Sequence, residues 1–359
     1  MQTQDAINPS MLILAREARG WTQTDLARTI RVGQGTIARY ELGERTPPPE
    51  HVDMIARALD FSTGFFAQHE HIVALGGDFL YRRRARVTAK DRRRVEAEAN
   101  IRRLQVLRML KLVERDDQIP FPYIDLDDVG RRPEKAAQLT RQAMRIPDGP
   151  IKSLTNWIES AGGIIFLTDF GTPQIDGTNM RMPGMPPLLF ASGKVPGERH
   201  RFNLAHELGH VVMHANVSTG DAEQEANEFA AEFLMPRKLI RGDLRNLDFA
   251  AALKLKQAWG VSVAALVKRA EDLKQISTAK ARRLFTTMNA QGYRLREPNP
   301  LPFEKAHAAT ELYRYVTDQV GFSTCEMREL LFTDRLGPVE VPSVPQMRIA
   351  GSHPDRAIN

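Results

Sequence analysis

Residues 206–210 read His-Glu-Leu-Gly-His, and this motif constrains local structure and chemistry more than any other stretch of the chain. The surrounding residues, Arg201 to His214, have the pattern of a helix, which places positions i and i+4 on one face. Two imidazoles at that spacing can bind one Zn²⁺, with Glu207 beside the open coordination position. The alternative is a solvated helix that carries two histidines and a glutamate. We interpret the motif as the metal-binding helix of a metallopeptidase, which uses such a site to activate water.

The composition describes a multidomain chain without export signals. Its 359 residues, 42% hydrophobic and 26% charged, are enough for two or three domains with their own cores. The first ten residues lack the basic and apolar regions of a secretory signal, and no apolar run approaches a membrane span. Cys325, the single cysteine, excludes an internal disulfide and suits a reducing compartment. We therefore expect a cytoplasmic protein without membrane contact, whose metal ligands are His and carboxylate.

Basic residues are concentrated in one segment. The net charge of +6 is compatible with nucleic-acid binding. Thr88–Glu114 has the pattern of one long helix, ended by the proline-bearing stretch 119–122, and it either connects two domains or forms a dimer seam. Its charged face is either a solvated surface or a phosphate-contacting one. The basic residues in and before this helix are Arg82, Arg83, Arg84, Arg86, Lys90, Arg92, Arg93, Arg94, Arg102 and Arg103.

Residues 10–69 have the pattern of a compact helical unit. We expect helices from Ser10, as the capping residue, through Arg19, and then over 22–30, 34–42 and 50–59. Two short helices joined by a glycine-containing turn, here at Val32-Gly33, are typical of a helix-turn-helix. The alternative is a helical adaptor.

This unit resembles the Xre/Cro/C1 family of DNA-binding domains, through the segments 15–23, 25–27, 35–41 and 43–47. The resemblance implies that the third helix enters the major groove of operator DNA. Gln34, Thr36 and Arg39 would then face base edges, and Gln23 and Arg45 would approach phosphates. Gly35 departs from the larger polar residue often found there, which weakens the expectation of base readout.

The residues around the His-Glu-Leu-Gly-His motif alternate between helical and extended patterns. Residues 130–161 are helical, and β-type runs follow at 163–168, 174–182 and 188–192. After the motif helix comes an acidic amphipathic helix, Asp221–Pro236, on which Glu223, Ala226, Asn227 and Ala230 share one face. The chain then returns to helices, most clearly over Leu253–Leu273. A small sheet beside a metal-binding helix is an α+β arrangement.

Phe202–His210 and Glu223–Pro236 together resemble the ImmA/IrrE family of zinc metallopeptidases, and the resemblance extends from about 151 to 297. In that family the third ligand is the glutamate of an E-x-x-A-N-type element, which here is Glu223. Glu225 is the rival, but its helical position points away from Asn227 and Ala230.

The resemblance implies a gluzincin-like site in which His206, His210 and Glu223 hold Zn²⁺ and Glu207 is the catalytic general base. Asn227 would orient a ligand, and His214 is interpreted as a flanking histidine. A substrate strand would add to an edge of the small sheet.

The expected fold is multidomain and mainly α, with an N-terminal all-α helix-turn-helix bundle, a small α+β zincin-like domain and a C-terminal helical region. The predicted divisions are 10–69 for the helix-turn-helix domain, 70–129 for a basic helical linker, 130–245 for the metallopeptidase domain, 246–336 for a helical C-terminal domain and 337–359 for a loosely structured tail.

The expected function is a DNA-binding transcriptional regulator with a zinc-dependent endopeptidase domain. The resemblance implies a limited cleavage in a repressor-type transcription factor, in a stress or mobile-element response. Expected partners are operator DNA, that protein substrate, a toxin and a second copy of the chain. The alternative is a non-proteolytic regulator or antitoxin-like protein whose zincin-like domain senses or binds a partner.

Overall fold

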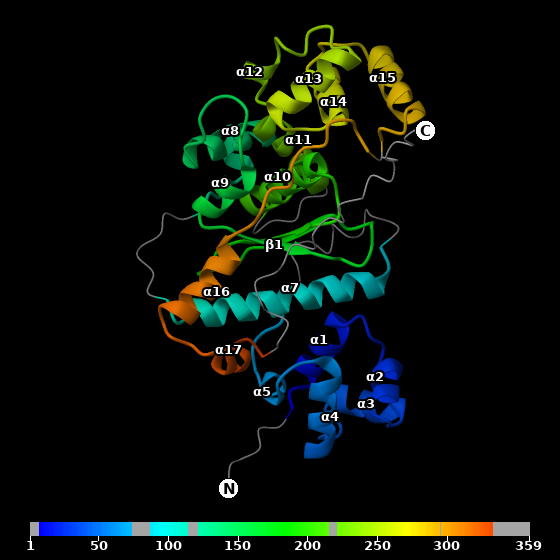
Figure 1. The fold of residues 1–359 in the computed structure, drawn as a ribbon, viewed down its shortest axis with the longest axis vertical. Coiled ribbons are helices and arrows are strands. Elements are labelled where there is room, and N and C mark those ends of the chain that lie inside the picture. The colour runs from blue at the N-terminus through cyan, green and yellow to red at the C-terminus, as the bar shows by residue number, and fades with distance from the viewer. Residues whose placement is uncertain (1–6, 74–86, 114–120, 215–220, 295, 333–359) are drawn as a thin grey trace, which may run out of the picture.

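The computed structural model describes residues 7–73, 87–113, 121–214, 221–294 and 296–332. A helical bundle lies at one end, helix α7 crosses the middle, and a small sheet with further helices lies beyond α7 (Figure 1). This arrangement confirms the expected fold class. The predicted tail at 337–359 and the basic residues Arg82, Arg83, Arg84 and Arg86 lie outside the described residues.

The N-terminal bundle consists of α1 (Pro9–Ala18), α2 (Gln23–Thr29), α3 (Gln34–Glu41), α4 (Pro49–Leu59) and the short α5 (Thr63–Phe66), which was not predicted. The predicted cap of α1 was wrong: Asn8, not Ser10, caps the helix, and its Oδ1 accepts the Ser10 amide at 3.0 Å. Pro9 then occupies the first helical position, where proline needs no amide hydrogen. Leu12, Leu26 and Ile37 are fully buried between the helices.

A buried ion pair fastens α1 to α3. Arg16 donates from Nε to Glu41 Oε1 at 2.5 Å and from Nη2 to Oε2 at 3.0 Å. Both residues are 8% exposed, so each charge depends on the other for compensation. The pair holds the helix that carries the predicted recognition residues.

Helix α7 (Ala89–Leu110) joins the bundle to the rest of the molecule. It begins after Thr88, whose side chain accepts the Asp91 amide, and it ends four residues before the predicted Glu114. One face contributes Ala97, Ile101 and Leu104 to the bundle core. Another face packs against the sheet with the buried residues Val95, Ala99 and Val106.

Neither interpretation of the charged face of α7 holds for Arg102 and Arg103. Arg103 is 4% exposed and donates from Nη2 to the carbonyl of His71 at 2.5 Å. Arg102 is partly buried, with its guanidinium over the ring of Phe166. The long aliphatic stems of arginine allow such packing on apolar surface. Helix α7 thus packs between the bundle and the sheet, and whether it also forms a dimer seam stays a prediction.

The sheet contains β1 (Ile164–Thr168), β2 (Gly177–Met180) and β3 (Leu188–Ser192) in the order β1-β3-β2. β1 is parallel to β3, and β2 is antiparallel to β3. Because strand side chains alternate between faces, Ile164, Phe166, Leu188 and Phe190 pack toward α7. Ile165 and Leu189 face the opposite way and join the core that contains the motif helix.

The helices on that second face surround the motif. They are α8 (Pro133–Ala143), α9 (Leu154–Ser160), α10 (Gly197–Met213), α11 (Ala222–Leu234), α12 (Arg237–Ile240), α13 (Phe249–Trp259), α14 (Val263–Asp272) and α15 (Thr278–Ala290), with a 3₁₀ turn at Asp127–Val129. The helical stretch predicted over Leu253–Leu273 consists of two helices, α13 and α14, because Gly260 ends α13 with a φ of 66°. One apolar core contains residues on both sides of the predicted boundary between residues 245 and 246. The division into two domains at that boundary stays a prediction.

The last described helices return to α7. α16 (Ala308–Asp318) and α17 (Thr324–Leu331) contribute Val316, Met327 and Leu331 to a small core with Met109 of α7 (Figure 1). Part of the predicted C-terminal helical region therefore packs on the middle of the molecule.

Within the described residues, none of the helices has both the length and the apolarity to span a membrane.

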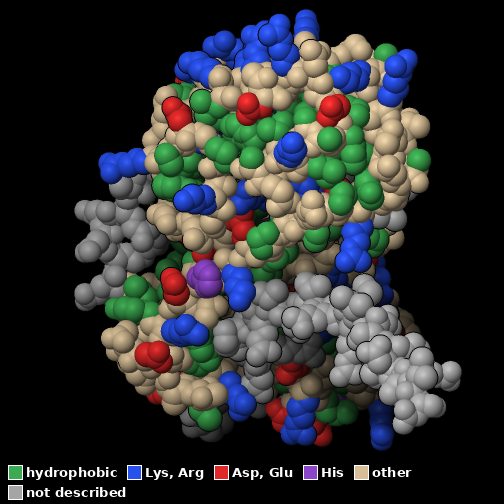
Figure 2. Space-filling view, turned by 45° about the horizontal axis from the view of Figure 1, so that its top comes forward, with side chains coloured by type: hydrophobic (Ala, Val, Ile, Leu, Met, Phe, Trp, Pro, Cys, Tyr) green, Lys and Arg blue, Asp and Glu red, His purple; other side chains and the backbone are tan. Residues whose placement is uncertain are grey.

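Lys and Arg side chains gather along the top of the molecule in Figure 2, at the α12–α15 end. The exposed basic residues between 237 and 245, in α12 and the turn after it, are Arg237, Lys238, Arg241 and Arg245.

We expect Glu41→Ala to destabilise the N-terminal bundle by about 3–5 kcal/mol, because it leaves the Arg16 charge buried without its carboxylate. Scanning calorimetry of the full chain measures the effect. The control is Glu44→Ala, an exposed change that should stay within about 0.5 kcal/mol. Equal transition temperatures in the two variants would contradict a stabilising role for the pair.

Candidate metal centre

Helix α10 places His206 and His210 one turn apart on the face that meets α11. The two side chains are nearly enclosed, with His206 7% and His210 3% exposed. Their Nε2 atoms lie 3.0 Å apart. The i, i+4 spacing thus brings the two imidazoles together as the sequence predicted.

Helix α11 brings Glu223 to the same point. Its Oε1 lies 3.4 Å from Nε2 of His210, and its Oε2 lies 3.8 Å from Nε2 of His206. Close packing of the two helices makes this possible, because a Cβ at Gly209 would lie 3.0 Å from Cδ1 of Phe229 on α11. Glycine inside the motif therefore lets α11 approach.

The rest of the structure determines which nitrogen of His206 carries its proton. Nδ2 of Asn227 donates to the carbonyl of Glu223 at 2.8 Å, so Oδ1 of Asn227 faces Nδ1 of His206, 3.1 Å away. His206 therefore donates from Nδ1 and keeps a lone pair on Nε2. Asn227 orients this imidazole, which agrees with the role expected for it.

A second chain of contacts does the same for His210. Glu225 Oε2 lies 2.9 Å from Nε2 of His214, and a carboxylate only accepts, so His214 donates from Nε2. Burial lowers the pKa of His214, with Glu225 opposing, so the ring is neutral and its Nδ1 accepts from Nδ1 of His210 at 3.0 Å. His210 therefore also keeps its lone pair on Nε2. Arg131 contacts the far oxygen of Glu225 at 3.4 Å.

The donor set fits a divalent cation. Three electron-rich atoms converge, namely both Nε2 atoms and a carboxylate oxygen, all within 4.8 Å of one another. They would repel one another unless a cation lies between them. A tetrahedral Zn²⁺ with bonds of about 2.0–2.1 Å requires ligand atoms about 3.3 Å apart, close to the separations here. Neutral imidazole and carboxylate are ligands that zinc prefers.

The titration behaviour of these groups agrees with that fit. Burial lowers the pKa of His210 to about 4, although Glu223 opposes it, so the imidazole is neutral at pH 7. This imidazole is thus in the protonation state that metal binding requires.

Glu207 directly follows His206 on α10 and is 4% exposed. Nδ2 of Asn179, from β2, donates to its Oε2 at 2.8 Å. Gly177 of the same strand passes so close that a Cβ there would lie 2.7 Å from Oε1 of Glu207. The strand therefore restricts both carboxylate oxygens of the predicted general base.

Three of these supporting residues were missed from the sequence: Gly177, Asn179 and Arg131. Their only sequence signal is that the first two alternate along a predicted strand, which does not indicate what the strand faces. Glu225, the rival ligand, contacts His214 and not the cluster of His206, His210 and Glu223. His214 in turn contacts His210, one of the predicted ligands.

The predicted DNA-contacting residues occupy the other end of the molecule. Gln34 and Arg39 of α3 are exposed, and Thr36 is partly so. Gln34 donates to Oε1 of Gln23 at 2.7 Å, which connects the starts of α2 and α3. Arg45 is exposed in the loop after α3.

Two segments of the chain match known families. Residues 159–271 match the peptidase M78 family, described as an IrrE N-terminal-like domain, and residues 12–66 match a family described as helix-turn-helix. No curated protein sequence matches the chain. The two matches confirm the resemblances drawn from the sequence. The chain thus joins a helix-turn-helix domain of the kind found in DNA-binding regulators to a zincin-like peptidase domain.

We expect His214→Ala to weaken zinc binding by about 10–100-fold, because His210 loses the acceptor that fixes its tautomer. Competition with a chromophoric chelator measures the dissociation constant. The control is His69→Ala, which removes an exposed histidine outside the site. Equal zinc affinity in the two variants would show that His214 does not support the centre.

Proposed function

We propose that this protein is a DNA-binding transcriptional regulator whose zincin-like domain is a zinc-dependent endopeptidase. The observation that carries the proposal is the convergence of His206, His210 and Glu223, with Glu207 held beside them. A peptidase domain that had kept only its fold would need neither the three converging ligands nor a positioned base.

Zn²⁺ held by these three residues would act as a Lewis acid, activating water and polarising the scissile carbonyl. Glu207 would accept the proton of the attacking water and deliver it to the leaving amine nitrogen. The Asn179 hydrogen bond to Oε2 holds the carboxylate in place for both transfers. Because Glu207 is almost enclosed, its proton transfers would occur largely shielded from bulk solvent.

The position of β2 supports an extended peptide as substrate. β2 is an outer strand of the described sheet, and its residues Gly177 and Asn179 contact Glu207. A peptide that added to this edge through main-chain hydrogen bonds would pass beside the general base. Side chains of the peptide would then select the cleavage point.

The helix-turn-helix domain indicates what kind of protein is cut. A peptidase bound at an operator meets the repressor of that operator at high local concentration. We therefore propose a limited cleavage of a repressor-type transcription factor, within the cytoplasm, during a stress or mobile-element response. We also propose that the protein binds a toxin partner and that it forms a homodimer.

We expect Glu207→Gln to retain zinc and lose proteolysis, because the amide cannot accept the proton of the attacking water. New protein N-termini in cells that express the wild type, but not the variant, identify the substrate. Zinc content by mass spectrometry is the control. Stoichiometric zinc without Glu207-dependent products would favour the non-proteolytic regulator or antitoxin-like alternative.

Two glycine variants test whether β2 positions the carboxylate of Glu207 for proteolysis. Gly177→Ala places a Cβ against Oε1 of Glu207 and should reproduce the loss of cleavage with zinc retained. Gly193→Ala is the control, because the nearest atom to its Cβ is 4.0 Å away. Full activity in both variants would argue against the positioning of Glu207 by β2.

We expect Arg39→Ala to weaken operator binding by about 1–3 kcal/mol, because an exposed arginine on the third helix can bond a guanine edge. The operator is first selected from random duplexes with the wild-type protein. Arg57→Ala, an exposed change on α4, is the control. Unchanged operator affinity in Arg39→Ala would contradict the recognition-helix assignment.

A further inference from the structure

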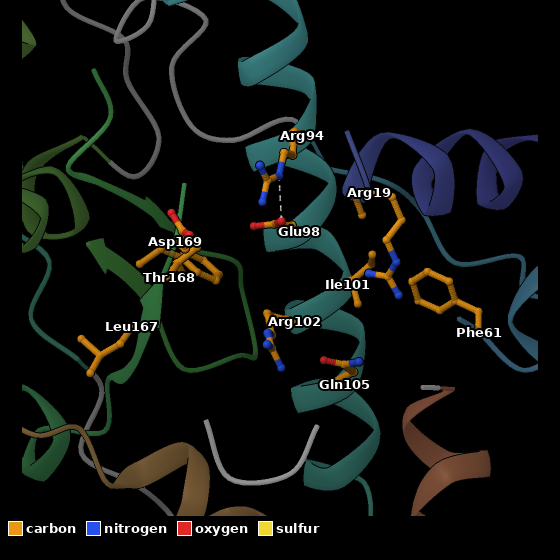
Figure 3. Close-up of a pocket in the computed structure, with 12 residues that line it drawn as sticks. Arg19, Phe61, Arg94, Glu98, Ile101, Arg102, Gln105, Leu167, Thr168 and Asp169 are labelled. Carbon is orange, nitrogen blue, oxygen red and sulfur yellow. Dashed lines mark hydrogen bonds and ion pairs between the residues drawn. The ribbon is translucent and has the colours of Figure 1, made fainter. Parts of the chain in front are cut away.

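A cavity of about 300 Å³ lies where the N-terminal bundle, α7 and the sheet meet (Figure 3). Helix α7 runs through the middle of the site. Arg19 and Phe61 approach from the bundle side, and Leu167, Thr168 and Asp169, at the end of β1, approach from the sheet side. Its volume is at the lower end of the range of small-molecule sites. The cavity shares none of its lining residues with His206, His210 or Glu223.

Most charges in the walls of the cavity already have partners. Arg94 donates to Glu98 at 3.1 Å, and Asp169 pairs with Lys194 at 2.5 Å. Arg19 donates to the carbonyl of Leu59 at 2.8 Å. These groups are occupied within the protein and do not require a ligand.

Arg102 is different. Its Nη1 is buried without a hydrogen-bond partner, and no hydrogen bond or ion pair involves its guanidinium within the described residues. Burial lowers the pKa of Arg102, and Glu98, whose carboxylate Arg94 already engages, opposes this only in part. Two arginines therefore share the carboxylate of Glu98, and the other carboxylate of the lining, Asp169, is paired with Lys194.

A second buried polar atom without a hydrogen-bond partner lies about one turn further along α7, in Gln105. Gln105 is 3% exposed, and its Nε2 donates to the carbonyl of Leu331 at 3.1 Å. That bond fixes the amide orientation and leaves Oε1 buried without a donor. A buried polar group without a partner costs about 1–3 kcal/mol, so a donor group in the cavity would be stabilising.

From these contacts we infer that the cavity is a binding site for a small organic anion, a carboxylate or a phosphate that also carries a hydrogen-bond donor. The anionic group would pair with Arg102, and the donor would reach Oε1 of Gln105. Phe61, Ile101 and Phe190 supply apolar wall for an organic body. The volume of the cavity limits the ligand to roughly the size of a small metabolite.

The location of the cavity suggests what the anion does. A ligand there contacts the bundle and the sheet at once, so it favours the arrangement in which both are docked on α7. The site would then allow a metabolite to influence both domains together. This consequence, unlike the binding itself, rests on the proposed function.

Binding is tested on the full chain with inorganic phosphate and acetate as separate probes, which distinguish the two anion types. The readout is the side-chain amide resonance of Gln105 in a ¹⁵N-labelled sample, assigned with Gln105→Leu. We expect a saturable shift at millimolar concentrations of at least one probe. Arg102→Met should weaken that binding at least tenfold, whereas Arg93→Met, an equal loss of charge at an exposed position of α7, should not.

Thermal unfolding provides a second, independent measurement. Without probe, Arg102→Met should raise Tm, because it removes a buried charge that lacks a partner. Added phosphate or acetate should raise the Tm of the wild type and of Arg93→Met more than that of Arg102→Met. Absence of a shift with both probes, or equal binding by Arg102→Met, would overturn the inference and leave a cavity that holds water only.

Discussion

The close contact of α10 with α11 is the constraint on which the candidate site depends. The two histidines come from one turn of α10, but Glu223 reaches them only because α11 lies against that turn. Gly209 permits this approach, since a Cβ there would press on the ring of Phe229. Phe229 and Phe233 stack with centroids 5.5 Å apart and are fully buried in the same core. The position of Glu223 is thus stabilised by apolar packing behind it, not by the polar residues of the site.

Helix α7 has the corresponding role at the scale of the whole molecule. It gives one apolar face to the bundle and another to the sheet, so the two domains are held through a shared helix. A helix buried on two sides must also bury charged residues from its sequence, and Arg102 and Arg103 are the result. Arg103 finds a carbonyl partner in His71, whereas Arg102 does not. The unsatisfied guanidinium is therefore a consequence of how the domains are joined.

Local patterns explain why much of the molecule could be predicted. Helices α1 to α4, the three strands and both motif-bearing helices follow from periodicity and capping, which depend on neighbouring residues. Asn179, Arg131 and the role of α7 could not be predicted, because they depend on which surfaces meet in three dimensions. The basic residues of α7 predicted a face exposed to solvent or to phosphates, but Arg102 and Arg103 are buried or partly buried against neighbouring elements. Gly260 could have indicated the break between α13 and α14, but the apolar period continues across it.

The competition between Glu223 and Glu225 has a structural answer that includes both residues. Two positions apart, their side chains leave the helix about 200° apart, so they cannot approach one atom together. Glu223 reaches the Nε2 atoms of the two motif histidines, and Glu225 reaches His214 one turn further along α10. Through His214, Glu225 determines which nitrogen of His210 keeps its lone pair. Asn227 does the same for His206, so one short segment of α11 supplies Glu223 and helps fix the tautomers of both motif histidines. Lone pairs held at 3.0 Å from each other are unfavourable by themselves, and a bound cation converts that repulsion into affinity.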